Sequence, residues 1–195
     1  MKKFIVERLN DSIKVKQELT KNEAYLDNVN ALAEAMILSI NNGGKLVICG
    51  NGGSASDAMH FAGEIVGRFQ KERRPWPAVV LNSDVATMTA IANDYSYDDM
   101  FARQAEAHLT PKDVFIGIST SGNSENVVRA INVAKQIGAK TACLVGNDGG
   151  KLGHMADYSI IIPCNVTARV QESHITTIHI LCEYVEAKLV EKEKI

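Results

Sequence analysis

Two side chains able to transfer protons or bind a metal, His60 and Glu64, stand four residues apart. Because residues i and i+4 lie on one face of an α-helix, this spacing places an imidazole beside a carboxylate. Just before them, the three glycines Gly50, Gly52 and Gly53 interrupt an apolar run. Unpaired backbone N–H groups at such a turn, at the start of a helix, attract an anion, most often phosphate. An anion-binding turn beside a candidate acid–base or metal pair predicts a phosphosugar site.

A second loop with similar chemistry runs from Ser119 to Ser124. It offers four hydroxyl groups and a glycine ahead of a predicted helix, and hydroxyls with free N–H groups hold phosphate without a fixed positive charge. One such loop is equally well explained as an ordinary capped turn, whereas two in one sheet favour phosphate binding. The first loop also fits the dinucleotide pattern GxGxxA, but the next strand has no acidic residue at the expected distance.

The last predicted helix, Val170–Val190, contributes Gln171, His174 and His179. His179 lies in an apolar run, where a buried imidazole needs a polar partner; a core histidine bonded to a neighbour is the alternative. Gln171 and His179 are eight residues apart, about 12 Å along a helix. Either Gln171 lies at the mouth of the helix, or the two residues serve from different chains. We favour a site shared between subunits.

The elements that position these residues follow from the apolar pattern. Strands are predicted at Leu46–Cys49, Ala78–Leu81, Val114–Ile118, Thr141–Val145 and Ile160–Pro163, and helices at Ala55–Phe69, Asp84–Ala92, Asp99–His108 and Glu125–Ile137. Asn93-Asp94 is expected to interrupt the helical pattern. Strands that alternate with helices favour an α/β fold, a five-stranded parallel sheet covered on both faces.

Two amphipathic helices, residues 3–19 and Asn22–Asn42, precede the first strand. Their apolar stripes need a partner, so we expect residues 1–42 to serve in packing or oligomerisation. Residues 43–195 would then form the α/β core of a single domain.

Composition limits the class of protein. The chain has 195 residues, 46% of them hydrophobic, and a formal net charge of -2, which gives no support to nucleic-acid binding. Its four cysteines include no CxxC pair and are most simply thiols in a reducing compartment. No apolar run is long enough to span a bilayer. We therefore expect a cytoplasmic protein with no membrane or nucleic-acid partner.

Four segments together resemble the sugar-isomerase (SIS) domain family: CGNGGSASDAMHFAGEI, LNSDVATMTAIANDY, IGISTSGNSENVVRAI and TARVQESHITTIHIL. The resemblance covers essentially the whole chain and is strongest to a bacterial branch that acts on a seven-carbon sugar phosphate. It implies a three-layer αβα sandwich and a homotetramer with sites at subunit interfaces. It also implies conversion of D-sedoheptulose 7-phosphate to D-glycero-D-manno-heptose 7-phosphate, the first committed step toward heptose in surface polysaccharide.

The resemblance also implies roles for individual residues. The family's acid–base pair corresponds to Glu64 and His179, and its zinc ligands, for one ion per subunit, to His60, Glu64, Gln171 and His179. Its substrate contacts correspond to Asn51, Gly52, Gly53, Glu64, Asn93, Asp94, Ser119, Thr120, Ser121, Ser124 and Gln171. Arg68, one turn beyond Glu64, is a further candidate, with a surface role as the alternative.

An isomerase of this kind moves a proton from C1 to C2 through an enediol, which requires a base, an acid and stabilisation of the oxyanion. The alternative is a non-catalytic member of the family that binds the bacterial replication initiator. That branch lacks the counterparts of Glu64 and His179, so their presence favours an enzyme. A sugar-phosphate sensor is a third class, but no basic helix-turn-helix is present.

Overall fold

A parallel sheet of five strands lies at the centre of the molecule, in the order β2-β1-β3-β4-β5. The computed structural model describes residues 1–192. The strands are β1 Leu46–Gly50, β2 Ala78–Val80, β3 Val114–Ser119, β4 Lys140–Gly146 and β5 Tyr158–Ile162. Every neighbouring pair is parallel, so the predicted α/β class and all five predicted strands are confirmed. β5 ends before Pro163, which has no N–H to donate to a neighbouring strand.

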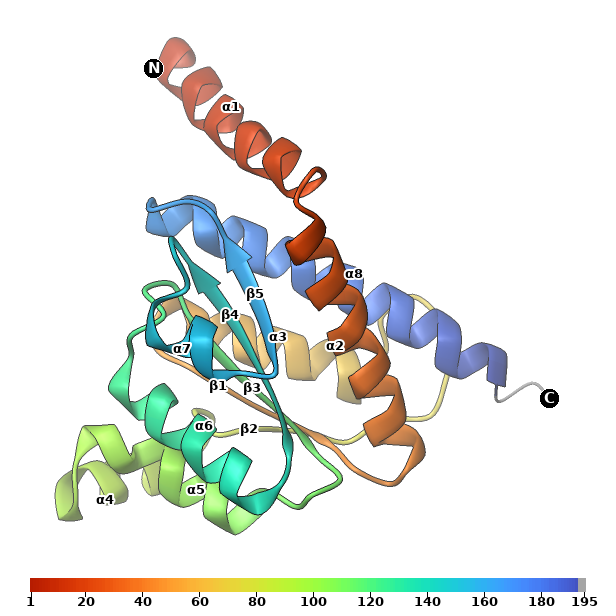
Figure 1. Cartoon of the computed structure of the whole chain (residues 1–195), viewed down its shortest axis with the longest axis vertical. Helices are drawn as coiled ribbons and strands as arrows, with labels where there is room; N and C mark the ends of the chain where they lie inside the picture. The colour runs from red at the N-terminus through yellow and green to blue at the C-terminus, as the bar shows by residue number, and fades with distance from the viewer. Residues whose placement is uncertain (193–195) are drawn as a thin grey trace.

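Helices cover both faces of the sheet (Figure 1), as the predicted three-layer sandwich requires. Alternate residues of β1 face opposite layers: Leu46 and Ile48 belong to one buried cluster, and Val47 and Cys49 to the other. The first cluster includes residues of α2 Glu23–Asn41, α3 Gly53–Val66 and α8 Thr167–Lys192. The second includes residues of α5 Met100–His108, α6 Glu125–Ile137 and α7 Gly150–Met155.

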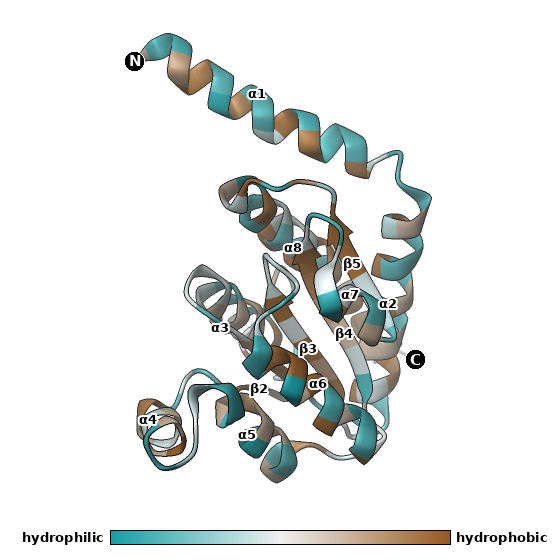
Figure 2. Ribbon diagram, turned by 60° about the vertical axis from the view of Figure 1, so that its left-hand side comes forward, coloured by the Kyte–Doolittle hydropathy of each residue, from teal (hydrophilic) through white to brown (hydrophobic). Residues whose placement is uncertain are grey.

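The first helix, α1 Lys2–Leu19, projects beyond the sheet (Figures 1 and 2) and contacts α8. Only Val15 and Leu19 of this helix are buried. Five of its large apolar side chains are exposed, namely Phe4, Ile5, Val6, Leu9 and Ile13. The predicted apolar stripe is therefore present, and most of it has no partner among residues 1–192.

The segment between β2 and β3 differs from the prediction in detail. The predicted interruption at Asn93-Asp94 is wrong, because α4 Val85–Asp94 continues through both residues and ends before Tyr95. A short 3-10 helix, η1 Tyr97–Asp99, then leads into α5. α4 contains no fully buried residue, and only Met88 and Ile91 pack against the second buried cluster, so its limits depend more on local chain preferences than on packing.

Two other differences have local causes. The helix predicted over Ala55–Phe69 ends at Val66, because Gly67 caps it and the following segment turns away. The short helix α7 was not predicted, since it starts in a run of turn residues and buries only Leu152. Among the helices of residues 1–192, none combines the length and apolar character that crossing a membrane requires.

Candidate active site

Helices α3 and α8 lie side by side and run in the same direction, and contacts at three levels join them. At the first level the amide of Gln171 packs against Gly53, where a Cβ would overlap its nitrogen. At the second, His179 meets His60. At the third, Glu186 accepts a hydrogen bond from the backbone just after α3. The two helices therefore form one rigid pair that carries most of the ionisable residues predicted for the site.

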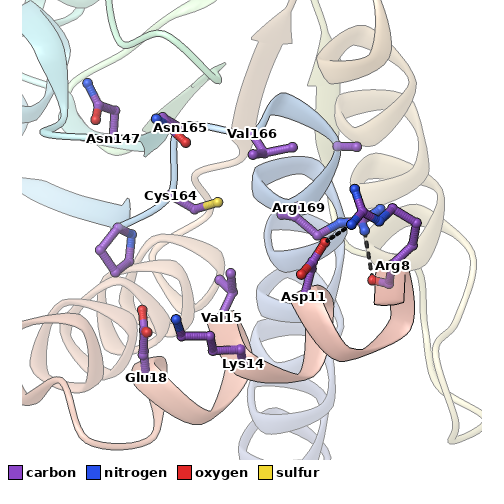
Figure 3. A pocket seen from close by; sticks show the side chains of 12 residues that line it. Arg8, Asp11, Lys14, Val15, Glu18, Asn147, Cys164, Asn165, Val166 and Arg169 are labelled. Carbon is purple, nitrogen blue, oxygen red and sulfur yellow. Dashed lines mark hydrogen bonds and ion pairs between the residues drawn. The ribbon is translucent and has the colours of Figure 1, made fainter. Parts of the chain in front are cut away.

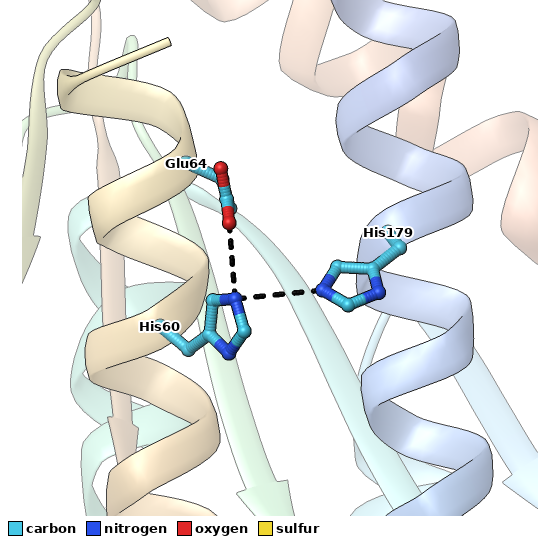
Figure 4. Close-up of side chains that lie close together, drawn as sticks. All are labelled: His60, Glu64 and His179. Carbon is cyan, nitrogen blue, oxygen red and sulfur yellow. Dashed lines mark hydrogen bonds and ion pairs between the residues drawn. The ribbon is translucent and has the colours of Figure 1, made fainter. Parts of the chain in front are cut away.

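The second level brings three predicted residues together (Figure 4). The Nε2 atom of His60 lies 3.0 Å from Glu64 Oε1 and 3.4 Å from His179 Nε2. One ligand atom from each residue lies within 4.8 Å of the others. The His60 side chain is 47% exposed and that of Glu64 23%. Because the cluster is open to solvent, a substrate can reach it.

The donor atoms of this cluster suit a divalent metal. Two imidazole nitrogens and a carboxylate oxygen are the ligand types that zinc takes, at about 2.0–2.2 Å. In a tetrahedral site with such bonds, neighbouring ligand atoms lie about 3.4 Å apart. The separations of 3.0 and 3.4 Å around His60 Nε2 are close to this value. The three residues therefore fit a zinc ion.

Gln171, the fourth predicted zinc ligand, lies apart from these three. Gly53, which it contacts, begins α3, and His60 follows seven residues later, about 10 Å along the helix. Within one chain the structure thus brings together His60, Glu64 and His179, and places Gln171 near the start of α8.

The two polar loops lie side by side at the carboxyl ends of β1 and β3, which are neighbours in the sheet. In the second loop, Ser119 Oγ lies 2.9 Å from Ser124 Oγ and 3.4 Å from Ser121 Oγ. Three predicted hydroxyls therefore converge ahead of α6, as an anion cradle requires. Thr120 is held through its carbonyl oxygen, which accepts a hydrogen bond from the N–H of Gly146.

A side-chain network that the sequence analysis missed ties the loops together. The Asn51 and Asn126 amides donate to each other, at 2.9 and 3.0 Å, and the Tyr97 hydroxyl donates to Asn51 Oδ1 at 2.8 Å. The Asn51 side chain is thus engaged within the protein, which leaves its backbone to contact a ligand. Asn126 is buried. It lies just after the N-cap of α6, a position that gives no local sign in the sequence that its side chain pairs with Asn51.

The other polar residues that the sequence analysis named lie outside the three-residue cluster and the two loops. Asn93 and Asp94 end α4, where the Asn93 amide donates to Asp94 Oδ1 at 2.8 Å. Arg68 lies 3.9 Å from Glu72, and its side chain is 60% exposed, which agrees with the surface role. His174 is fully buried against the carbonyl of Val145. Burial outweighs that contact and lowers the pKa of His174 to about 4.

A cavity of about 830 Å³ opens elsewhere, between α1 and the start of α8 (Figure 3). Charged side chains of both helices line it, among them Lys14, Glu18 and Arg169. Arg169 joins the two helices by donating to the carbonyl of Arg8 at 2.8 Å. None of the residues that line this cavity is among the predicted site residues.

Comparison with known proteins agrees with the geometry. The family model described as SIS domain matches residues 9–146. A phosphoheptose isomerase of Helicobacter pylori (strain P12) is 47% identical over 186 residues, 95% of this chain and 92% of that protein. One from Trichlorobacter lovleyi is 50% identical over 190 residues, 97% of this chain and 95% of that protein. The solved structure of the phosphoheptose isomerase from Neisseria gonorrhoeae superposes with a TM-score of 0.90 at 39% identity, covering 95% and 98% of the two chains.

Proposed function

The chain belongs to the SIS domain family and, within it, to the phosphoheptose isomerases, and we propose that it converts D-sedoheptulose 7-phosphate to D-glycero-D-manno-heptose 7-phosphate. It is an aldose–ketose isomerase. The observation that carries the proposal is the convergence of Glu64, His60 and His179 on one exposed edge between α3 and α8. The non-catalytic alternative is not favoured, since the two residues that it lacks are present here and lie together.

Glu64 acts as the base on carbon. It takes the proton from C1 of the ketose, the C1–C2 enediol forms, and Glu64 returns the proton to C2. His179 moves the second proton, from the hydroxyl on C1 to the oxygen on C2, so that the aldehyde forms at C1. Glu64 and His179 can act on one substrate because their ligand atoms lie within 4.8 Å of each other, beside His60.

His60, Glu64 and His179 would hold one zinc ion per subunit, and the partner subunit's Gln171 would be the fourth ligand that the family resemblance predicts, since Gln171 of the same chain packs against the start of α3. When bound, the ion supplies a Lewis acid that polarises a carbonyl oxygen. The fit of the three side chains to zinc supports this assignment.

The two loops bind the phosphate end of the substrate. Ser119, Ser121 and Ser124 provide converging hydroxyls, and backbone N–H groups at the start of α6 favour negative charge. The backbone at Gly52 and Gly53 and the residues Asn51 and Thr120 complete this end. Asn93, Asp94 and Gln171 bind hydroxyl groups of the sugar.

The site is shared between subunits of a homotetramer. Gly53 and Glu64 are eleven residues apart on α3, about 16 Å along the helix, whereas an extended seven-carbon chain with its phosphate spans only about 10 Å at normal bond lengths. The exposed apolar side chains of α1 support the same proposal. Residues 1–42 serve in packing and oligomerisation, and the α/β core spans residues 43–192, while the last three residues of the predicted core lie outside the described part of the chain. The four free cysteines support a reducing compartment, the cytoplasm.

The test is incubation of the purified protein with sedoheptulose 7-phosphate, with and without a chelator, followed by identification of the product. The proposal predicts the aldoheptose 7-phosphate, and a lower rate after chelation. Absence of turnover by zinc-loaded protein, together with capture of the replication initiator, would favour the non-catalytic alternative instead.

A further inference from the structure

Glu186 is a buried carboxylate on α8 that holds the segment following α3. Its residue is 1% exposed. Its two oxygens accept hydrogen bonds from the backbone N–H groups of Phe69, Gln70 and Lys71 at 2.9, 2.7 and 2.8 Å. Burial raises the pKa of Glu186, but these bonds and that from Arg73 outweigh it and hold the pKa below its ordinary value. The group is therefore a charged anchor for the chain at residues 69–71.

Arg73 completes the anchor and caps α3. Its Nε donates to Glu186 Oε1 at 2.9 Å, and both side chains are almost fully buried. Its Nη2 donates to the carbonyl of Glu64 at 2.8 Å, and its Nη1 to that of Ile65 at 3.0 Å. The last carbonyls of a helix lack partners within it, so the guanidinium satisfies groups that would otherwise be orphaned. It also stacks on Trp76, 3.7 Å from the ring centre.

This anchor contacts both helices that carry the proposed acid–base pair, α3 with Glu64 and α8 with His179. Glu186 follows His179 by seven residues, two helical turns, so the two lie on nearly the same face of α8. Arg73 bonds to the backbone of Glu64 itself. Phe69, held by Glu186, places its ring 5.7 Å from the ring of His179. The Glu186–Arg73 pair therefore joins the end of α3 to α8 next to the reacting groups.

A buried ion pair with its hydrogen bonds satisfied is a weak source of net stability, but it specifies one arrangement of the groups around it. Here it opposes sliding or rotation of α8 against α3. Such a movement would change the separation of Glu64 and His179, and an ångström of misplacement can cost a large factor in rate.

We propose that Glu186 and Arg73 are positioning residues for the isomerase reaction, which fix Glu64 and His179 relative to each other. The proposal rests on the proposed function. The phosphate loops lie at the opposite end of α3, so loss of the anchor should impair the chemical step and leave substrate binding nearly unchanged.

The experiment compares steady-state kinetics of Glu186→Gln, Arg73→Lys and the double variant with those of the wild type. Glu191→Gln, which removes an exposed glutamate from the same helix, is the matched control. We expect kcat of each single variant to fall by about tenfold to a hundredfold, with KM within about threefold. The double variant should lose no more than the worse single variant, because both residues act through one anchor.

Histidine NMR supplies a readout that does not depend on turnover. Removal of the anchor should shift the ring resonances of His179, assigned with His179→Gln, because the Phe69 ring moves. Circular dichroism identifies the variants that fold. If Glu186→Gln does not fold, the kinetics and resonances of Arg73→Lys test the proposal in its place. If the wild type is active and a folded anchor variant has unchanged kcat and unchanged His179 resonances, the positioning inference is overturned and the proposed function is not. Wild type without turnover would overturn the proposed function, and the resonances would then decide whether the anchor positions His179.

Discussion

The Nε2 atom of His60 lies 3.4 Å from the Nε2 atom of His179, one on α3 and the other on α8. Their rings meet edge to face, with centroids 5.1 Å apart. Two imidazole nitrogens that face each other at this distance need a proton or a cation between them, since each carries a lone pair when deprotonated. Glu64 adds a carboxylate to the same atom of His60. The three residues therefore act as a unit, and a change in one should alter the others.

Replacement of a ligand should release zinc. Loss of an outer-shell partner alone can cost 10- to 100-fold in metal affinity, so His60→Ala should weaken zinc binding by at least about a hundredfold. The affinity is measured by competition with a chromogenic chelator, with His154→Ala, which removes an exposed histidine, as control. Equal affinity of His60→Ala and the wild type would contradict the assigned ligand set.

Gly53→Ala should affect substrate binding more than folding. The new Cβ would overlap the end of the flexible Gln171 side chain, which can move aside at little cost in stability. We expect KM for sedoheptulose 7-phosphate to rise, because Gln171 is displaced from the position in which it binds the sugar. Gly63→Ala is the control, since a Cβ there meets nothing within 4 Å and alanine stabilises a helix by about 0.5–1 kcal/mol relative to glycine. A KM no higher than that of Gly63→Ala would argue against a substrate contact by Gln171.

Burial of His174 should make the protein less stable in acid. Its pKa falls from 6.5 to about 4 on folding, so between these values the unfolded chain binds the proton more tightly. The contribution of His174 to the free energy of unfolding is therefore fully present above pH 6.5 and is lost as the pH falls toward 4. The loss between pH 7 and 5 should be about 2 kcal/mol. Urea unfolding at both pH values measures it, and His174→Leu should remove this part of the dependence. An equal pH dependence in that variant would show that other groups cause it.

A charge on the exposed face of α1 should disrupt the assembly. Leu9 is 59% exposed in the single chain, so Leu9→Glu costs little in folding but would bury a charge in the proposed interface. Analytical ultracentrifugation should show a tetramer for the wild type and smaller species for Leu9→Glu. The control is Glu7→Gln, an exposed position on the same helix. A wild-type monomer would contradict the tetramer, and an intact Leu9→Glu tetramer would exclude Leu9 from the interface.

The parts of this structure that the sequence predicted depend on local patterns. The five strands have continuous apolar runs, and His60 and Glu64 have a helical spacing that determines their common face. The parts that it missed depend on contacts distant in sequence. Glu186 is 117 residues from Phe69, and Asn51 is 75 residues from Asn126. Neither glutamate nor asparagine shows by its neighbours in sequence which backbone group or amide it will meet. The position of Gln171 likewise depends on how α8 packs on α3, which no local pattern specifies.

The central claim is that the Glu64 carboxylate moves the carbon-bound proton, and kcat of Glu64→Gln tests it most directly. Glutamine preserves the shape of the side chain and removes the base. With Glu191→Gln as control, and with circular dichroism and zinc content measured on the same samples, we expect kcat for sedoheptulose 7-phosphate to fall by about 10²- to 10⁴-fold, the usual contribution of a general base. A folded, zinc-loaded Glu64→Gln protein with wild-type kcat would contradict the account.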